Sequence, residues 1–285
     1  MNLFDKLVSQ ALQNQHNLAN LRIVVEKELL HHDILRIMRD NNLLLGLTFI
    51  GGTCLRTCYG GTRLSEDLDF TGGNDFSRAK LSAMGKILVD NLHHKYGLKV
   101  SVQAPIKDKQ NVDTWKIVIT TRPEARDLPS QRINIDVCSV LSYERRPMML
   151  VNPYGVDMGT SGLIIQVQSR EEIYSDKLLA FALRPNRVKY RDIWDILWLH
   201  GQGIVPSLEL IPLKLKERQI EVAHFHTLFS ERLKAFQKQP NLMKEFKTEM
   251  QRFLQLEQVE KILNQENLLE FFCSLMEDFV RKIKS

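Results

Sequence analysis

The chain has 285 residues, of which 44% are hydrophobic and 26% are charged, and its formal net charge is +5. This composition is ordinary for a globular protein of one large or two modest domains, and it argues against a mainly disordered chain. No apolar run approaches the ~18 residues that a membrane helix needs, and the N-terminal segment lacks the pattern of a signal peptide. We therefore expect a cytoplasmic protein that makes no membrane contact.

The four cysteines form no C-x-x-C pair and accompany no histidine spacing typical of zinc, so we expect buried, reduced thiols. Residues 1–45 carry apolar side chains at spacings of three and four, which predicts an amphipathic helix ending near Asp40. His31 and His32 are adjacent on this helix and cannot face one site, so we expect both at the surface.

The apolar residues 47–50 form the pattern of a strand, which ends in Gly51 and Gly52 before a helix opens at Thr53. Such a turn exposes backbone N–H groups and the positive end of a helix, which suit a phosphate. A Gly-Gly pair before a helix is, taken alone, more often a plain turn. A purely structural role for the two glycines is therefore an open alternative.

Asp67 and Asp69 follow in a segment whose period-2 alternation places both carboxylates on one face of a strand. Two carboxylates so placed can share Mg²⁺, whose remaining ligands are waters and substrate phosphate oxygens. Arg63 and Ser65 lie just upstream and offer a fixed positive charge and a hydroxyl to a triphosphate. An Asp-x-Asp motif alone is more often a solvated strand edge, so the combination of features carries the prediction.

This order of features resembles the nucleotidyltransferase superfamily, whose signature is a Gly-Gly or Gly-Ser turn, a helix and an Asp-x-Asp strand. More narrowly, residues 51–56 (GGTCLR) followed by residues 63–70 (RLSEDLDF) are similar to the AbiEii/AbiGii-type nucleotidyltransferase toxins of bacterial abortive-infection and toxin–antitoxin systems. The resemblance implies an α/β (α+β) fold: a nucleotidyltransferase-type mixed sheet with flanking helices at residues 1–165. A helical domain at residues 166–285 would complete the active site and bind the acceptor or a partner.

After the central segment, residues 72–75 predict a loop, and Asp75 or Ser77 can cap a helix that Gly97 ends. Residues 98–104 and 114–121 alternate like neighbouring strands, with a polar hairpin loop at residues 105–113. Residues 142–161 are rich in Pro, Gly and Asn, which predicts a domain boundary or a long crossing loop, and residues 163–167 predict a short last strand.

Residues 132–138 alternate so that Asp136 projects from one face of a strand whose other face is apolar. A single Asp in a strand is, taken alone, more often structural. In the superfamily that the chain resembles, a third carboxylate lies on the strand beside the Asp-x-Asp strand, and residues 135–137 match that pattern. The resemblance therefore implies that Asp136 joins the two upstream carboxylates.

Residues 171–181 predict a helix that Ser169 caps and that carries Lys177. Asp192 and Asp195 are three residues apart and so share one face of the next helix. This Lys…Arg-Asp-x-x-Asp arrangement again resembles the AbiEii-type family, which implies that Lys177 contacts the nucleotide phosphates. Asp195 is then our first choice for a direct role, whereas Asp192 can instead cap the helix or pair with Arg191.

The segment between residues 177 and 200 contains five Lys or Arg residues and two Asp residues. We call this local excess of positive charge the basic strip. The members of the strip predicted to bind the acceptor are Arg184, Arg187, Lys189 and Arg191. Residues 207–285 predict a helical bundle that carries no catalytic signature and offers a charged outer face to a partner or to RNA.

Together these features predict a nucleotidyltransferase of the EC 2.7.7 type, which moves a nucleoside monophosphate from an NTP to an acceptor and releases pyrophosphate. Mg²⁺ or Mn²⁺ is its expected metal. The metal ligands would be Asp67, Asp69 and Asp136. The catalytic residues would be these three aspartates together with Lys177 and Asp195. The residues expected to bind the nucleotide are Gly51, Gly52, Thr53, Arg63, Ser65, Lys177 and Asp192.

The resemblance implies that the acceptor is RNA, specifically the 3′ end of tRNA, that transfer inhibits translation and growth, and that a cognate antitoxin encoded nearby neutralises the toxin. Two alternatives stay open: a nucleotidylyltransferase acting on a protein or small molecule, and a catalytically vestigial binding module.

Overall fold

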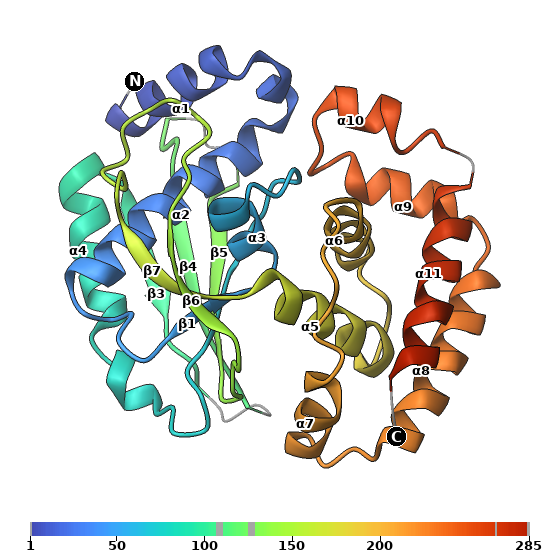
Figure 1. Ribbon diagram of the computed structural model, residues 1–285. Helices are drawn as coiled ribbons and strands as arrows, with labels where there is room; N and C mark the ends of the chain where they lie inside the picture. Colours follow the sequence, from blue (N-terminus) through green and yellow to red (C-terminus); the bar gives the residue numbers. More distant parts are fainter. Residues whose placement is uncertain (1, 107–110, 125–128, 266, 284–285) are drawn as a thin grey trace. The chain divides into compact units, whose positions relative to one another are not determined.

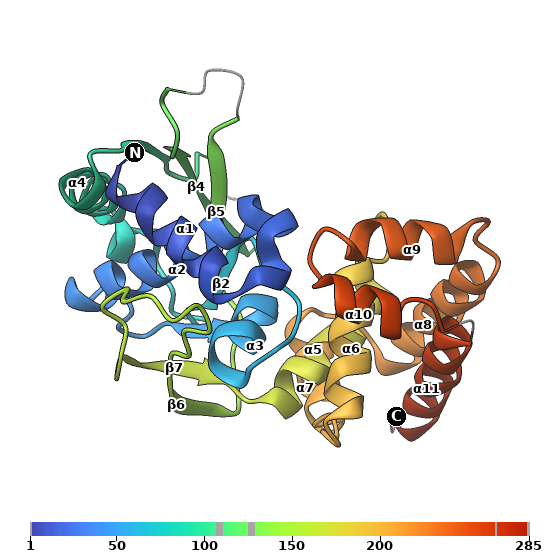
Figure 2. The same ribbon diagram turned by 90° about the horizontal axis from the view of Figure 1, so that it is seen from above.

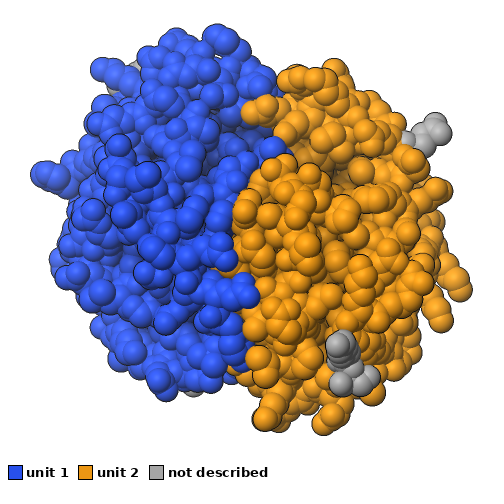
Figure 3. Space-filling model, viewed as in Figure 1, with its two compact units in different colours: residues 1–168 blue, residues 169–285 orange. Residues whose placement is uncertain are grey.

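The computed structural model describes residues 2–106, 111–124, 129–265 and 267–283. The chain divides into two compact units, residues 1–168 (unit 1) and residues 169–285 (unit 2), which Figure 3 shows in blue and orange. The sequence suggested a division after residue 165. Among the described residues, the helices are all too short or too polar to cross a membrane.

Unit 1 contains a seven-stranded mixed sheet with helices around it (Figure 1). The strand order is β3-β4-β5-β2-β1-β7-β6; β2 runs parallel to β5, β1 runs parallel to β7, and the other neighbours are antiparallel. The elements are α1 (Leu3–Asn14), η1 (His16–Leu21), α2 (Arg22–Asp40), β1 (Thr48–Ile50), α3 (Gly51–Tyr59), β2 (Leu68–Thr71), η2 (Arg78–Leu81), α4 (Met84–Tyr96), β3 (Lys99–Gln103), β4 (Val112–Thr120), β5 (Gln131–Cys138), β6 (Arg145–Met149) and β7 (Ile164–Gln168).

Helices α2 and α4 cover one face of this sheet (Figures 1 and 2). The residues of β4 and β5 that face them are buried and apolar, and they include Trp115, Ile117 and Ile135. Alternate residues of the same strands are half-buried or exposed, as expected for a sheet with one apolar face. The predicted mixed sheet with flanking helices is therefore confirmed.

The histidine prediction is wrong. His31 and His32 are 0% and 1% exposed. Their ring nitrogens hydrogen-bond the Glu66 carbonyl and the Thr160 hydroxyl, each at 3.0 Å. Because loop segments from two other parts of the chain pack onto α2, this helix is buried on more than the single face that its periodicity predicts. Burial lowers the pKa of both imidazoles to about 4.

Three further expectations need correction. The N-terminal segment is broken into α1, η1 and α2, although the last helix ends at Asp40 as predicted. Helix α4 begins at Met84, because the short turn η2 intervenes after Ser77. Strand β6 lies in the stretch where we expected a loop; it is an edge strand with mostly exposed residues, Pro147 among them, so it lacks a hydrophobic alternation. Of the expected hairpin loop, residues 107–110 lie outside the described residues.

Among its described residues, unit 2 contains helices joined by loops and no strand, as predicted. Its elements are α5 (Arg170–Leu183), α6 (Tyr190–Gly201), α7 (Leu210–Glu217), α8 (Val222–Gln237), α9 (Leu242–Met250), α10 (Leu256–Lys261) and α11 (Leu268–Lys282). Ser169 caps α5 by accepting the Glu172 N–H at 2.9 Å. Phe181 of α5 lies in an aromatic core, where its ring contacts those of Phe229 and Phe272 at centroid distances of 5.4 and 5.7 Å.

Candidate functional site

The glycine turn lies between β1 and α3, and both glycines are needed there. Gly51 has a φ of +77°, and a Cβ on it would lie 2.8 Å from Oδ2 of Asp69. A Cβ on Gly52 would overlap the guanidinium of Arg63. The missing side chains thus allow a carboxylate and a guanidinium to approach the start of α3 closely. The helix begins at Gly51, two residues before the expected Thr53.

The three predicted carboxylates lie on neighbouring strands. Asp69 of β2 is directly opposite Asp136 of β5 in the parallel register. Asp67 precedes β2, and its Oδ1 accepts the Asn134 N–H at 3.0 Å. All three aspartates are half-buried, whereas Leu68 between the first two is completely buried. The structure therefore brings the three acidic residues together at the same part of the sheet, on the side that Gly51 leaves open.

This donor set fits a magnesium ion that is bound jointly with a nucleotide. Within the ranges that the structure describes, no three His, Cys, Asp or Glu side chains could hold a metal ion by themselves. Mg²⁺ is usually bound by one or two carboxylates together with substrate phosphates and waters, not by an all-protein cage. The pair Asp69 and Asp136 supplies carboxylates of that kind, and the glycine at position 51 gives them room.

Thr53 and Ser65 are buried and hold the scaffold together. The Thr53 hydroxyl hydrogen-bonds the Ser65 hydroxyl and donates to the Asp67 carbonyl, so α3 is tied to the segment that leads into β2. Arg63 is 5% exposed, and its Nη1 donates to the Leu64 carbonyl at 3.1 Å. These contacts fix the conformation of residues 63–67 beside the glycine turn.

Glu28 of α2 is a functional candidate that sequence reasoning missed. It is 1% exposed, and its Oε1 accepts the Ser65 N–H at 2.8 Å. It also accepts hydrogen bonds from Arg56 and from the Tyr154 hydroxyl, and its negative charge adds to burial in raising the pKa of Tyr154. The sequence contains one indication of its burial. Glu28 follows Val24 by four residues and therefore occupies a position in the apolar stripe of its helix.

In unit 2, Lys177 lies between two aspartates of α6. Its Nζ is 2.5 Å from Asp192 and 2.9 Å from Asp195, and both carboxylates are buried. Arg184 approaches Asp192 at 2.5 Å from the other side. Although burial opposes ionisation, these two cations hold the pKa of Asp192 far below its usual value. The two aspartates share one helical face as predicted.

The predicted acceptor residues differ in exposure. Arg187 has a side chain that is 75% exposed, and Lys189 is also exposed. Arg184 is engaged with Asp192. Arg191 lies 3.9 Å from Glu249 and stacks over the Phe253 ring.

A mixed sheet that presents carboxylates from adjacent strands beside a glycine turn, followed by a helical unit, defines a nucleotidyltransferase-type protein. A family model described as "Nucleotidyl transferase AbiEii toxin, Type IV TA system" matches residues 33–266. The chain therefore belongs to the AbiEii family of nucleotidyltransferase toxins of toxin–antitoxin systems, and it is a nucleotidyltransferase.

One of the similar solved structures superposes with a TM-score above 0.5 and shares the fold. MenT4, a nucleotidyltransferase toxin of Mycobacterium tuberculosis H37Rv, superposes with a TM-score of 0.55 at 14% identity, covering 98% of this chain and 99% of that one. JHP933 of Helicobacter pylori gives a TM-score of 0.49 at 20% identity, with 91% and 94% covered. A putative nucleotidyltransferase of H. pylori gives 0.49 at 18% identity, with 90% and 97% covered. Comparison with curated protein sequences gave no match.

Proposed function

We propose that this chain, with Mg²⁺ or Mn²⁺, transfers a nucleoside monophosphate from an NTP to RNA, and that the 3′ end of tRNA is the acceptor. Transfer would block translation and growth until a cognate antitoxin encoded nearby neutralises the toxin in the cytoplasm. The observation that carries the proposal is that Asp69 and Asp136 lie opposite each other on neighbouring strands beside Gly51. Because Gly51 has no side chain, the Asp69 carboxylate has room there.

In the reaction, the acceptor hydroxyl oxygen bonds to the α-phosphorus, the bond from that phosphorus to the bridging oxygen breaks, and pyrophosphate leaves. Asp67, Asp69 and Asp136 would hold the metal, which lowers the pKa of the acceptor hydroxyl and offsets phosphate charge when bound. Gly51 and Gly52 let the backbone at the start of α3 approach the triphosphate closely.

The remaining side chains position these groups or add charge. Arg63 offsets negative charge on the leaving pyrophosphate. Thr53 and Ser65, whose hydroxyls bond each other, act through the shape of the loop they tie down. In unit 2, we assign Lys177 to the triphosphate, with Asp195 and Asp192 fixing the position of its ammonium group.

The test is incubation of the purified protein with total cellular RNA, Mg²⁺ and each α-labelled NTP in turn. Label should enter RNA, and Asp69→Asn should abolish transfer with the fold retained, because it removes a charge that the metal needs. Asp90→Asn, which alters an exposed aspartate of α4, is the matched control and should remain active. Label that enters protein or a small molecule and never RNA would contradict the RNA acceptor.

The acceptor contacts in unit 2 make a separate prediction. Replacement of Arg187 and Lys189 by Ala should weaken RNA binding and flatten its salt dependence while NTP binding stays nearly intact. The control replaces Lys238 and Lys244, two exposed lysines of the same unit. Equal losses for RNA and NTP would show that Arg187 and Lys189 serve the nucleotide or the fold.

A further inference from the structure

The face of β3, β4 and β5 that points away from α2 and α4 carries exposed polar side chains. A Cβ on Gly85 of α4 would lie 3.5 Å from Val102, so α4 packs against the side of β3 that bears Val102. The residues on the opposite side alternate with the buried ones, and Ser101, Gln103, Lys116 and Arg132 are exposed. Lys116 and Arg132, together with Lys99 on the same side of β3, give this face three cations.

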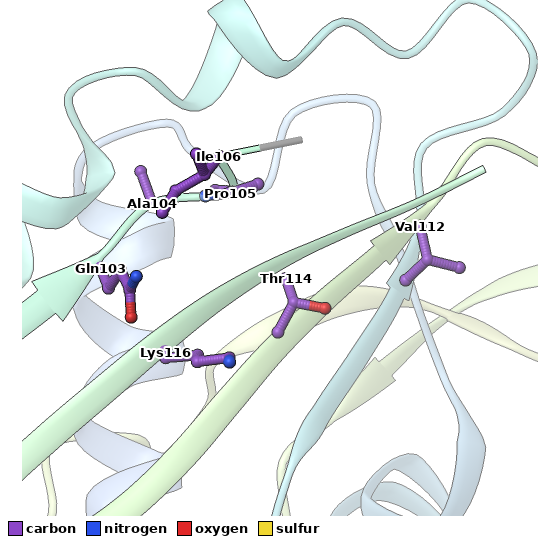
Figure 4. A pocket seen from close by; sticks show the side chains of 7 residues that line it. All are labelled: Gln103, Ala104, Pro105, Ile106, Val112, Thr114 and Lys116. Carbon is purple, nitrogen blue, oxygen red and sulfur yellow. The ribbon is translucent and has the colours of Figure 1, made fainter. Parts of the chain in front are cut away.

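Two hollows follow this face. One, of about 400 Å³, is lined by Gln103, Ala104, Pro105, Ile106, Val112, Thr114 and Lys116 (Figure 4). The other, also of about 400 Å³, is lined by Ser101, Val102, Gln103, Lys116, Ile117, Val118, Arg132 and Asn134. Both are lined by Gln103 and Lys116, so the two hollows adjoin each other, and we call them together the sheet groove.

The strand register connects the sheet groove to the carboxylates. Thr114 in the groove is directly opposite Asp136, which is directly opposite Asp69. Lys116 is opposite Asn134, whose backbone N–H is bound by Asp67. Since neighbouring strands are about 4.8 Å apart, the β4 residues lie about 10 Å from β2 across the sheet. The groove therefore runs past the acidic residues, with Val112 on one side of their level along the strands and Lys116 and Arg132 on the other.

We propose that the sheet groove binds the single-stranded end of the RNA acceptor, an inference that rests on the proposed function. Lys116 and Arg132 would bind backbone phosphates and so offset their repulsion by the nearby carboxylates of β2 and β5. Ile106 and Val112, which are 77% and 40% exposed, would pack against bases. A protein partner fits this surface less well, because the core of a protein interface is depleted of charged residues.

The test measures binding of a fluorescein-labelled, short single-stranded oligoribonucleotide by anisotropy over a range of salt concentrations. The double variant Lys116→Ala, Arg132→Ala should bind on the order of tenfold more weakly. The slope of log affinity against log salt should fall by about 1.4, since each phosphate contact on a single strand contributes about 0.7. NTP binding and the melting temperature should match the parent.

Two further variants control for charge and position. Exchange of Lys116 for Arg and Arg132 for Lys keeps both charges and should keep most of the affinity. Replacement of Lys80 and Lys86 by Ala removes two exposed cations elsewhere in unit 1 and should leave RNA binding unchanged.

Failure of the groove assignment and failure of the proposed function would give different results. Parental RNA affinity in the Lys116/Arg132 double variant would overturn the groove assignment, even if the parent transfers nucleotide to RNA. Parental RNA affinity combined with lost neutralisation by the antitoxin would assign the face to a protein partner and overturn it as well. Failure of the parent to label any RNA would reject the proposed function. The anisotropy measurement would still test the groove, because it detects RNA binding and does not need nucleotide transfer.

Discussion

The substitution Gly51→Ala should damage catalysis far more than stability. Gly51 has a φ of +77°, which costs a residue with a Cβ about 1–2 kcal/mol. For a unit of this size that cost lowers the melting temperature by roughly 2–8 °C. The new methyl group would also lie 2.8 Å from Oδ2 of Asp69, so the carboxylate must retreat by about 0.6 Å to reach an ordinary contact of 3.4 Å. Displacements of this order cost roughly ten- to a hundredfold in rate.

Gly60→Ala is the matched control for this effect. Gly60 ends the same helix with a φ of +74°, and a Cβ on it would meet nothing within 4 Å. Both variants should therefore melt at similarly lowered temperatures, whereas kcat/KM for nucleotide transfer should fall only in Gly51→Ala. Equal activity in the two variants would refute the argument that Gly51 is there to make room for Asp69.

Three further predictions concern buried charge. The free energy of unfolding, measured with urea, should fall as the pH decreases from 6.5 toward 5: His31 and His32 have native pKa values of about 4 against 6.5 when unfolded, so the unfolded chain takes up more protons in this window. Glu28→Gln should destabilise the protein by about 3 kcal/mol in the same assay and should also slow transfer, because it leaves Arg56 buried without its counter-ion and loosens the loop at Ser65. Lys177→Ala should abolish transfer and lower the unfolding free energy by about 3–5 kcal/mol. Asp192 and Asp195 would stay buried after they had lost the ammonium group that lies between them.

The controls for these predictions come from the surface. Glu257→Gln and Lys261→Ala break an exposed i,i+4 ion pair of α10 and should leave both stability and transfer unchanged. An unfolding free energy that stays constant between pH 6.5 and 5 would contradict the histidine argument. Melting of Lys177→Ala at the parental temperature would mean that the two aspartates do not depend on Lys177.

Local sequence patterns predicted much of the geometry of the candidate site, because that geometry is local. The alternation around Asp67 and Asp69 and around Asp136 specifies a face for each carboxylate, and the glycines specify a close approach. The i,i+3 spacing of Asp192 and Asp195 likewise placed both on one helical face.

Features that depend on contacts distant in sequence could not be predicted in the same way. His31 and His32 are buried because loops that contain Glu66 and Thr160 fold over α2, which no periodicity within the helix shows. Glu28 reaches Tyr154 across 126 residues of sequence. The destabilisation expected of Lys177→Ala is of the same kind, since only the structure shows how closely two buried carboxylates surround this ammonium group.

A nucleotidyl transfer moves the α-phosphate of the NTP and not its γ-phosphate, so the position of a label distinguishes it from a phosphoryl transfer. With RNA and Mg²⁺, an NTP labelled on the α-phosphate should transfer its label to RNA, while the same NTP labelled on the γ-phosphate should release all of its label in pyrophosphate. Asp69→Asn should show neither reaction. Transfer of the γ-label to RNA would identify a phosphoryl transfer instead and would rule out nucleotidyl transfer by this chain.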